Sequence, residues 1–580
     1  MSAIHRRVFE AGGPALLFEK VKGSRYRAVS NLFGTLERSK FIFRQTWEAT
    51  QRIVALREDP VKALKHPLQH LGSVGAALTA LPMKQRNVLS GFEEIKITDV
   101  PLIKHWSMDG GAFITLPQVY SEDPAAPGIM KANLGMYRVQ LTGNDYEPNK
   151  EIGLHYQIHR GIGIHQHKAN RLGEPLKVSI FVGGPPAHTV AAVMPLPEGL
   201  SEMLFAGLLS GRRFRYGYDA DGYCISQDAD FVITGEIHPG ETKPEGPFGD
   251  HLGYYSLVHP FPLMRVRKVY AKPQAIWPFT VVGRPPQEDT SFGALIHELT
   301  GSAIKQEVPG VKEVHAVDSA GVHPLLLAIG YERYTPYTKV KQPAELLTIA
   351  NRILGTNQLS LAKYLFIAAE EEQPLSTHHE AEFFKYVLER IDLRRDIHFQ
   401  TNTTIDTLDY SGHGLNQGSK VIFAACGDQI RDLCTEVPEQ LQGLRSYTSP
   451  RLVLPGIVAI EGPAFSTYAE AEKQMQELTS AIEARGQMPG CPLIVVCDDS
   501  TFVSDTLDNY LWTTFTRSNP AHDIYGVNAE TVYKHWGCDN VIIDARAKTH
   551  HAPPLVVDQE AERRIDPIFA QGGSLSSVLR

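Results

Sequence analysis

The sequence predicts a mixed α/β (α+β) fold built from three successive regions. Its 580 residues are enough for three or four domains of ordinary size. Short β-rich runs separated by Gly- and Pro-rich turns fill the centre, and strand-like runs alternate with helix-like runs toward the C-terminus. We expect an N-terminal α/β region over 1–110, a central β-barrel-like domain over 111–318, a C-terminal α/β domain with a largely parallel sheet over 319–545, and an arm over 546–580.

Each region is predicted from its own pattern. In the first, apolar runs such as FIFRQTW stand beside helix-like stretches such as EDPVKALKHPLQHL. The central strands are expected at YRVQLTG, LKVSIFVGG, DFVITGEI, MRVRKVYAK and AIWPFTVVG, with one helix-like insert, EGLSEMLFAGLLSG. In the third, PLLLAIGY, KVIFAAC, RLVLPGIVAI and PLIVVCDD alternate with helical stretches. Residues 50–95 and 372–415 are expected to be inserts, the second one helical.

Composition and charge exclude several classes of protein. Hydrophobic residues make up 43% and charged residues 21%, an ordinary globular balance, and the net charge is −8. No block of Lys or Arg occurs, so no nucleic-acid partner is expected. Six scattered cysteines without a CxxC pair indicate reduced thiols in a cytoplasmic protein. The start lacks a secretory apolar run and no run is long enough to span a bilayer, so we expect no stable membrane insertion.

Common catalytic motifs are missing from the sequence. It contains no G-x-x-x-x-G-K-[ST] phosphate loop, no G-x-S-x-G nucleophile elbow and no H-E-x-x-H zinc motif. A histidine cluster, LHYQIHRGIGIHQHK, places His155, His159, His165 and His167 within a short stretch. Imidazoles at this spacing can bind a metal, but without a cysteine partner or a known zinc spacing most of them are expected to be structural or exposed. A metal-dependent hydrolase that uses this cluster is therefore one open alternative.

Two acids stand on either side of a tight turn in PEGPFGDHLGYY. Glu245 and Asp250 flank Gly246–Gly249, and a Gly-Pro-Phe-Gly stretch cannot continue as a helix because Pro lacks a backbone donor. Two other short stretches, NLGMYR at 133–138 and PLPEGLSE at 195–202, look structural when they are taken alone. Together with MDGGAFIT, QIHRGIGIH, VGGPPA, GRPP, PLIVVCDD and LWTTFTR, they form an ordered series along the chain.

This ordered series resembles the UbiD family of reversible decarboxylases, which use prenylated flavin mononucleotide (prFMN). The resemblance extends from GGPALLFEKVKGS at 12–24 to about residue 545, and EGPFGD followed by GYY is its most specific part. It implies that the central domain is a split barrel that binds prFMN and that the C-terminal domain mediates oligomerisation. It also implies a carboxy-lyase acting on an aromatic, heteroaromatic or α,β-unsaturated carboxylic acid.

The resemblance also assigns the residues that hold the cofactor. Members of the family bind the cofactor phosphate through a divalent and a monovalent cation, and the matching metal ligands here are Asn133, His159 and Glu202. Mn²⁺ or Mg²⁺, together with K⁺ or Na⁺, suits oxygen ligands with one imidazole. The cofactor-binding segment is completed by Gly135, Met136, Tyr137 and Arg138.

The catalytic set implied by the resemblance is Arg138 with Glu245 and Asp250. Many members carry Glu where this chain has Asp250, which shortens the reach of the acid. Loss of CO2 from an sp² carbon needs an electron sink, which no side chain provides, so the flavin must act as the sink. We expect Asp250 to be protonated and to deliver the proton after CO2 has left, and Glu245 to stay ionised beside Arg138. In some members a Lys approaches the cofactor, but the aligned residue here is Asn540.

Several points stay open at the level of the sequence. A second alternative function is a non-catalytic prFMN-binding or assembly factor in quinone biosynthesis, whose mark would be a broken catalytic trio. The trio could also merely stabilise the turn, although buried ion networks are poor stabilisers. Substrate identity, pathway and direction are not encoded in any motif. The expected partners are a small carboxylic acid, a flavin prenyltransferase that supplies the cofactor, and further copies of the chain in a homodimer or homohexamer.

Overall fold

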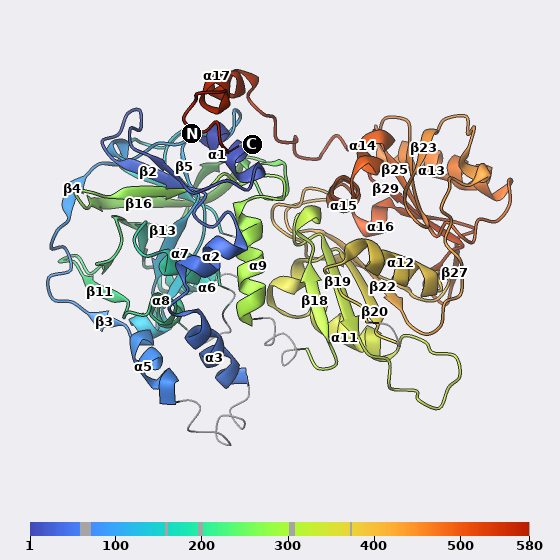
Figure 1. Ribbon diagram of the computed structural model, residues 1–580, viewed down its shortest axis with the longest axis horizontal. Coiled ribbons are helices and arrows are strands. Elements are labelled where there is room, and N and C mark those ends of the chain that lie inside the picture. Colours follow the sequence, from blue (N-terminus) through green and yellow to red (C-terminus); the bar gives the residue numbers. More distant parts are fainter. Residues whose placement is uncertain are drawn as a thin grey trace. The chain divides into compact units, whose positions relative to one another are not determined.

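The computed structural model describes residues 1–58, 71–156, 161–194, 196, 201–300, 308–371 and 374–578 (Figure 1). The chain forms two compact units. Unit 1 consists of Met1–Thr300 together with Pro554–Arg580, and unit 2 consists of Gly301–Pro553. The chain therefore leaves unit 1, builds unit 2 and returns to unit 1 for its last segment.

The centre of unit 1 is a large antiparallel sheet, with nine strands in the described part of the chain. Eight of them pair in the order β5-β8-β9-β16-β13-β10-β6-β7, and β4 pairs with β16. The strands are β4 (Glu93–Ile95), β5 (Phe113–Ile114), β6 (Pro117–Ser121), β7 (Asn133–Gly135), β8 (Val139–Gln140), β9 (Glu151–Leu154), β10 (Leu176–Val182), β13 (Phe231–Glu245) and β16 (His259–Ala271). Because β5 and β7 do not pair with each other, these described strands form no closed barrel.

Alternation along the strands gives this sheet an apolar core on each face. Ile180 and Ile233 belong to one buried cluster, whereas Phe181 and Val232 belong to another. Successive side chains of a strand point to opposite faces, so the two clusters lie on opposite sides of the sheet. Both faces must therefore be covered, and the long strands β13 and β16 in Figure 1 run through the middle of the unit.

Helices and small sheets complete unit 1. The helices are α1 (Ser2–Glu10), α2 (Leu36–Ile42), α3 (Trp47–Glu58), α5 (Leu71–Ala80), α6 (Gly161–Leu172), α7 (Pro186–Val193), α8 (Glu202–Ser210), α9 (Glu288–Thr300) and α17 (Gln559–Phe569). The small sheets are β1 (Leu16–Phe18) with β2 (Arg27–Ser30) and β17 (Ile276–Phe279), β12 (Cys224–Ser226) with β11 (Arg215–Tyr218) and β3 (Met83–Lys84), and β14 (Phe248–Gly249) with β15 (Tyr255–Ser256). None of the helices in the described residues is long and apolar enough to cross a membrane.

Unit 2 contains two five-stranded sheets, as counted in the described residues, with the same topology. In the first, β18 (Glu313–Ala316), β19 (Leu325–Gly330), β20 (Tyr364–Ala369), β22 (Gly418–Ala425) and β21 (Ile397–Thr403) pair in that order; in the second, β23 (Thr448–Leu454), β24 (Ile457–Glu461), β25 (Leu493–Cys497), β29 (Asn540–Asp544) and β26 (Ile524–Val527) do so. In each sheet the three inner strands are parallel and both edge strands are antiparallel.

Helices and one hairpin surround these two sheets. They are α11 (Glu345–Leu354), α12 (Glu380–Arg390), α13 (Tyr468–Glu483), α14 (Ser500–Asp505), α15 (Leu507–Thr516), α16 (Pro520–Asp523), and the hairpin of β27 (Glu530–Val532) and β28 (His535–Gly537). One buried cluster contains Leu327 of the first sheet and Val495 of the second, so the two sheets share an apolar core.

The mixed α/β class expected from the sequence is confirmed. The β-rich centre is an open antiparallel sheet in the described residues, and the expected largely parallel sheet is two mixed sheets, parallel at their centres. Within 372–415, the described residues form helix α12 and strand β21, which pairs with β22 of the first sheet. The last segment carries helix α17, which packs against α1 (Figure 1).

Candidate active site

The site begins at the end of strand β13, where the chain turns at Glu245. Gly246 has a φ of +95°, a conformation that residues with a Cβ atom rarely adopt. The amide of Gly246 donates to Oε1 of Gln140 at 2.9 Å, and the side chain of Asn144 donates to the Gly246 carbonyl at 2.9 Å. The amide of Gly110 donates to the Pro247 carbonyl at 2.7 Å. Two separate segments, one at Gly110 and one at Gln140–Asn144, therefore fix the turn between the two acids.

Arg138 lies between the acids and bonds to both. Its Nε and Nη2 atoms donate to the two carboxylate oxygens of Glu245, each at 2.8 Å, which is a bidentate ion pair. Its Nη1 atom donates to Oδ2 of Asp250, and Nη2 also donates to the Ser256 hydroxyl at 2.8 Å. The guanidinium carbon lies 4.7 Å from the ring centroid of Phe248, the aromatic residue of the turn. The residues expected to form the trio are thus brought together.

The charges of the two acids differ from the expectation of one neutral and one ionised group. Burial would raise the pKa of Glu245, but the Arg138 charge and hydrogen bonds from His155 and Arg138 outweigh it and lower this pKa to about 2. Burial likewise opposes ionisation of Asp250, yet Arg138 and His251 lower its pKa below the ordinary value. A shared guanidinium between two carboxylates favours ionisation of both, because each sees an opposite charge closer than the like charge.

A histidine adjoins each acid of the trio. His155 Nδ1 lies 3.2 Å from Oε2 of Glu245, and the ring is buried against Phe261, with the ring centroids 4.0 Å apart. Its Nε2 atom is buried and has no hydrogen-bond partner in the described residues. At the other end, His251 Nδ1 lies 2.8 Å from Oδ1 of Asp250. Because Glu245 is an ionised acceptor, the proton of neutral His155 belongs on Nδ1.

A third buried acid, Asp109, binds the turn through backbone hydrogen bonds. Its Oδ1 accepts the amide of Gly249 at 2.8 Å, and its Oδ2 accepts the amides of His105 and Trp106 at 3.0 and 2.9 Å. MDGGAFIT belongs to the ordered series, but no role for this aspartate was expected from the sequence. Its only sequence signal is its place in that motif, because the contact joins residues 140 positions apart.

Two of the three expected metal ligands lie on neighbouring elements. Asn133 begins β7 and Glu202 begins α8, and Oε2 of Glu202 accepts the amide of Leu134 at 3.1 Å. Burial raises the pKa of Glu202 to about 7, and Nδ2 of Asn133 is buried without a hydrogen-bond partner in the described residues. A buried carboxylate beside an amide oxygen suits a hard cation, which would supply the missing positive charge. His159 lies outside the described residues.

The rest of the cofactor-binding segment runs from β7 to Arg138. A Cβ atom on Gly135 would lie 2.1 Å from the Tyr137 ring, so only glycine fits there. The amide of Met136 donates to the Ala192 carbonyl at 2.8 Å, and the Tyr137 hydroxyl donates to Oδ1 of Asn133 at 3.2 Å. This packing fixes the positions of Asn133 and Arg138 relative to each other.

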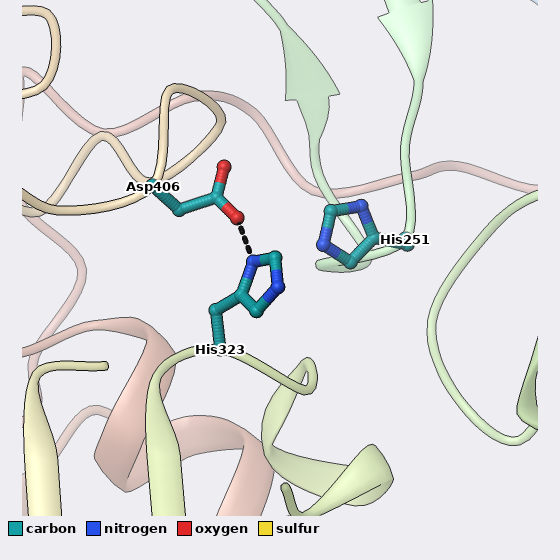
Figure 2. Close-up of side chains that lie close together, drawn as sticks. All are labelled: His251, His323 and Asp406. Carbon is teal, nitrogen blue, oxygen red and sulfur yellow. Dashed lines mark hydrogen bonds and ion pairs between the residues drawn. The ribbon is translucent and has the colours of Figure 1, made fainter. Parts of the chain in front are cut away.

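The described histidines of the sequence cluster have separate partners. His155 belongs to the acid network, whereas Nδ1 of His165 lies 2.9 Å from the Ser121 hydroxyl and His167 is exposed. In unit 2, another histidine, His323, bonds through Nδ1 to Oδ2 of the buried Asp406 (Figure 2). The described residues of the sequence cluster therefore do not gather into one metal site.

Asn540, where some family members have a Lys, has a structural role in unit 2. It is buried in β29, and its side chain donates to the carbonyls of Met488 and Cys491 at 2.8 and 2.9 Å. A lysine does follow later on the same segment: Lys548 is buried and forms an ion pair with Asp523 at 3.3 Å. Lys548 was not among the residues expected from the sequence.

Comparison with known families covers most of the chain. The models of the N-terminal, Rift-related and C-terminal domains of 3-octaprenyl-4-hydroxybenzoate carboxy-lyase match residues 1–57, 79–285 and 290–425. The chain belongs to the UbiD family. As a UbiD protein it is a carboxy-lyase, and the resemblance found in the sequence is confirmed.

Two chlamydial relatives match along nearly the whole chain. A protein of Chlamydia pneumoniae, named as one of the subunits of a 4-hydroxybenzoate decarboxylase, is 34% identical over 574 residues, covering 97% of this chain and 92% of the relative. An uncharacterised protein of Chlamydia trachomatis is 35% identical over 571 residues, with the same coverage. The similarity to these relatives therefore continues beyond residue 425, where the last family model ends.

Solved structures share the fold at low identity. The closed form of vanillic acid decarboxylase from Sedimentibacter hydroxybenzoicus matches with a TM-score of 0.61 and 21% identity, over 82% of this chain and 92% of that one. The UbiD-class enzyme HmfF from Pelotomaculum thermopropionicum, in complex with FMN, matches with a TM-score of 0.55 and 20% identity, over 76% and 91%.

Proposed function

We propose that this UbiD protein is a prFMN-dependent reversible decarboxylase of an aromatic, heteroaromatic or α,β-unsaturated carboxylic acid. The observation that carries the proposal is the bidentate contact of Arg138 with Glu245, together with its contact to Asp250. Such a set of buried charges contributes little net free energy to the stability of a turn, because each ion must be desolvated. It is suited to a reaction that must move one proton at a fixed place.

Decarboxylation replaces a carboxylate by a proton and releases CO2. Bound prFMN supplies the electron sink that the breaking carbon–carbon bond requires. Asp250 then donates a proton from its carboxyl group to the carbon that carried CO2. Glu245 remains ionised and fixes the direction of the guanidinium, so Arg138 holds Asp250 within reach of the reacting carbon. In the reverse direction, the Asp250 carboxylate removes that proton.

Asp250 must first gain a proton, since Arg138 and His251 lower its pKa in the substrate-free protein. A substrate carboxylate entering near Arg138 adds a third negative charge and competes for the guanidinium. Both effects raise the pKa of Asp250, because a nearby like charge disfavours ionisation. Substrate binding therefore favours protonation of Asp250, and this is the proton that the reaction later consumes.

Asn133, His159 and Glu202 are proposed to hold Mn²⁺ or Mg²⁺, with K⁺ or Na⁺, against the cofactor phosphate. The raised pKa of the buried Glu202 supports a cation at this place, because a positive charge would offset the cost of burying the ionised carboxylate. Gly135, Met136 and Tyr137 are proposed to line the cofactor with Arg138. A flavin prenyltransferase is the proposed source of the cofactor, and the assembly is proposed to be a homodimer or homohexamer.

Co-expression with a flavin prenyltransferase tests the proposal. The purified protein is expected to show a prenylated flavin by mass spectrometry and to exchange the ring or vinyl proton of product compounds with D2O. Hydrogen–deuterium exchange reports binding and proton transfer even when net conversion is unfavourable. Bound flavin without exchange on any acid or product of a broad panel would instead favour the assembly factor in quinone biosynthesis. A protein that binds zinc and no flavin would favour the hydrolase.

A further inference from the structure

Two cysteines of unit 2 lie side by side although they are distant in sequence. Cys434 precedes the second sheet, and Cys491 immediately precedes strand β25. The amide of Cys434 donates to the carbonyl of Gly490 at 2.8 Å, and the amide of Gly456 donates to the carbonyl of Cys434 at 3.0 Å. Because Gly490 is bonded directly to Cys491, the two cysteine Cα atoms are roughly 5–7 Å apart, which is the spacing that disulfides bridge.

Their side chains also lie on neighbouring segments. The Cβ atom of Cys434 would lie 3.6 Å from a Cβ atom on Gly490, the residue before Cys491, and the Cys491 thiol donates to the Leu493 carbonyl at 3.8 Å. Cys491 is fully buried among the apolar residues of the second sheet, whereas Cys434 is partly exposed. Both are free thiols, so the pair is open to oxidation. The Cys434 thiol is accessible to a small molecule, and the Cys491 thiol is buried close to it.

The pair differs from the other four cysteines, all of which are described. Cys224, Cys426, Cys497 and Cys538 are buried, and burial raises the pKa of each thiol. For Cys434 the influence of the neighbouring Cys491 thiol outweighs burial and lowers the pKa, and backbone amides add to this effect. The Cys434 thiol in turn raises the pKa of Cys491. The thiolate, which is the reactive form, therefore belongs to Cys434.

We propose that Cys434 and Cys491 form a reversible redox site, in which Cys434 is the attacking cysteine and Cys491 the resolving cysteine. The oxidant is a low-molecular-weight disulfide of the glutathione type. The Cys434 thiolate attacks one sulfur of that disulfide, forms a mixed disulfide and releases one small thiolate. The Cys491 thiol then loses its proton and attacks the sulfur of Cys434, which closes the protein disulfide and releases the second small thiol. Two protein thiols are oxidised and one small disulfide is reduced to two thiols.

The new bond would close a loop that contains β23, β24 and α13. Closing so long a loop restricts the unfolded chain, and we expect the unfolding temperature of unit 2 to rise by roughly 5–15 °C. Addition of a dithiol reductant should reverse the shift. The disulfide is therefore expected to stabilise the second sheet reversibly.

The test uses the reduced full-length protein and oxidised glutathione as the probe. Peptide mass spectrometry without reduction should detect a Cys434–Cys491 link in the wild-type protein. Cys491→Ser should stop at a stable glutathione adduct on Cys434, and Cys434→Ser should give neither product. Cys538→Ser removes a buried cysteine of the same unit and should link like the wild type. Brief treatment with iodoacetamide should alkylate Cys434 at least 10-fold faster than Cys426.

The proposal is wrong if the folded wild-type protein gives no link between these cysteines after prolonged treatment. It is also wrong if Cys434 is alkylated no faster than Cys426, or if Cys491→Ser links Cys434 to another cysteine. Circular dichroism of each variant before treatment establishes that the comparison is made on folded protein. Alkylation of the wild type needs no variant, so the assignment can be tested even if one serine variant fails to fold.

Discussion

At the scale of single residues, Arg138 balances two carboxylates with one positive charge. With Glu245 and Asp250 both ionised, the cluster carries one excess negative charge, and a substrate carboxylate adds another. Glu245 takes two guanidinium N–H groups and His155, whereas Asp250 takes a single guanidinium N–H and His251. The acid that binds fewer guanidinium donors is the one expected to accept the extra proton, which assigns this role to Asp250.

Asp250→Asn tests that assignment. The amide keeps the size of the side chain but cannot donate a proton as an acid, so turnover should fall by roughly 10²- to 10⁴-fold while flavin binding is retained. Turnover is followed by CO2 release or proton exchange, and flavin binding by absorbance. Glu241→Gln, at a partly exposed acid of strand β13, serves as the control and should keep full activity. Wild-type turnover in Asp250→Asn would remove Asp250 from the mechanism.

His155→Phe tests the histidine beside Glu245. The substitution keeps an aromatic ring against Phe261 but removes the hydrogen bond from Nδ1, so the pKa of Glu245 should rise from about 2. Glu245 must be ionised to hold Arg138, and activity is lost as the pH falls through its folded pKa. We therefore expect the acid limb of the kcat/KM profile to move to higher pH, with a larger loss at pH 5 than at pH 8. The control is His167→Phe, which replaces an exposed histidine.

An unchanged profile in His155→Phe between pH 5 and pH 8 would mean that the histidine only fills space. An equal loss at every pH would indicate altered packing rather than an altered charge on Glu245. The two results are separated by the ratio of activities at pH 5 and pH 8, which does not depend on how much active protein each preparation contains.

The sequence was sufficient to predict that the three trio residues meet, but not to predict which residues surround them. Arg138, Glu245 and Asp250 stand in motifs whose order along the chain indicates the family, so their meeting was predictable. His155 stands 90 positions from Glu245, and Asp109 stands 140 positions from Gly249. Such contacts depend on which strands pair, which no local pattern encodes. The direction of the Asp250 pKa was not predictable from the sequence either, because the position of one guanidinium between two acids decides it.

At the scale of elements, the turn after β13 depends on close backbone packing. A Cβ atom on Gly249 would lie 2.1 Å from Cδ1 of Trp106, and one on Gly110 would lie 2.1 Å from the Gly246 carbonyl oxygen. Gly249 also donates its amide to Asp109. Strand β14 therefore sits where it does because glycine lets it approach Trp106, and Asp250 follows directly from it.

Gly249→Ala should displace this strand. We expect a loss of about 1–3 kcal/mol in the free energy of unfolding and a lower kcat, since Asp250 moves with the strand. Gly75→Ala is the matched control: it lies inside α5, where a Cβ atom meets nothing within 4 Å, and should stabilise the protein by up to about 1 kcal/mol. Chemical denaturation and steady-state kinetics measure the two effects. Equal stabilities of both variants would contradict the packing argument.

Helix α8 carries the proposed metal ligand Glu202 at its first position. Added MnCl2 should raise the unfolding temperature of the chelator-treated protein, because a ligand that binds only the folded state adds about 2.7 kcal/mol at 100 times its Kd. Glu202→Gln should abolish this rise and weaken flavin retention. Glu174→Gln, an exposed acid, should respond like the wild type. A full Mn²⁺ response in Glu202→Gln would refute the metal assignment.

At the scale of the whole molecule, unit 2 repeats one arrangement twice. In both sheets the strands, counted along the chain, lie in the order first, second, third, fifth, fourth. The third and fifth strands are parallel to each other, and the fourth is antiparallel to the fifth. Alternating strand and helix runs predicted parallel pairing, but the number of sheets was not predictable. The residues of β22 and β29 are equally buried, and only long-range pairing assigns each to its sheet. No repeat was visible in the sequence, because a shared topology needs only a shared pattern of burial.

Within unit 1, the last segment of the chain bonds to the loop that follows Asp250. The amide of Leu555 donates to the carbonyl of Gly253 at 3.1 Å, three residues after Asp250, and α17 follows. On α17, Glu562 accepts hydrogen bonds from Arg6 and Arg7 of α1, each at 2.8 Å. Phe569 of α17 joins a small apolar cluster with Ala3 and Val8 of α1. The segment thus connects α1 to the loop that follows Asp250.

Truncation after residue 553 should therefore lower both stability and turnover, whereas Phe569→Ala should mainly lower stability. The truncated chain loses the apolar cluster and the Leu555 bond, so we expect unit 1 to unfold at a lower temperature and kcat to fall about 10-fold. Phe569→Ala removes apolar contacts but keeps the backbone bond, and should cost about 2–4 kcal/mol with kcat preserved below the transition. Calorimetry can follow the two units separately, because unit 2 has its own cores and its transition should not move. Equal kcat in the truncated and full-length proteins would show that the Gly253 loop holds its position without the C-terminal segment.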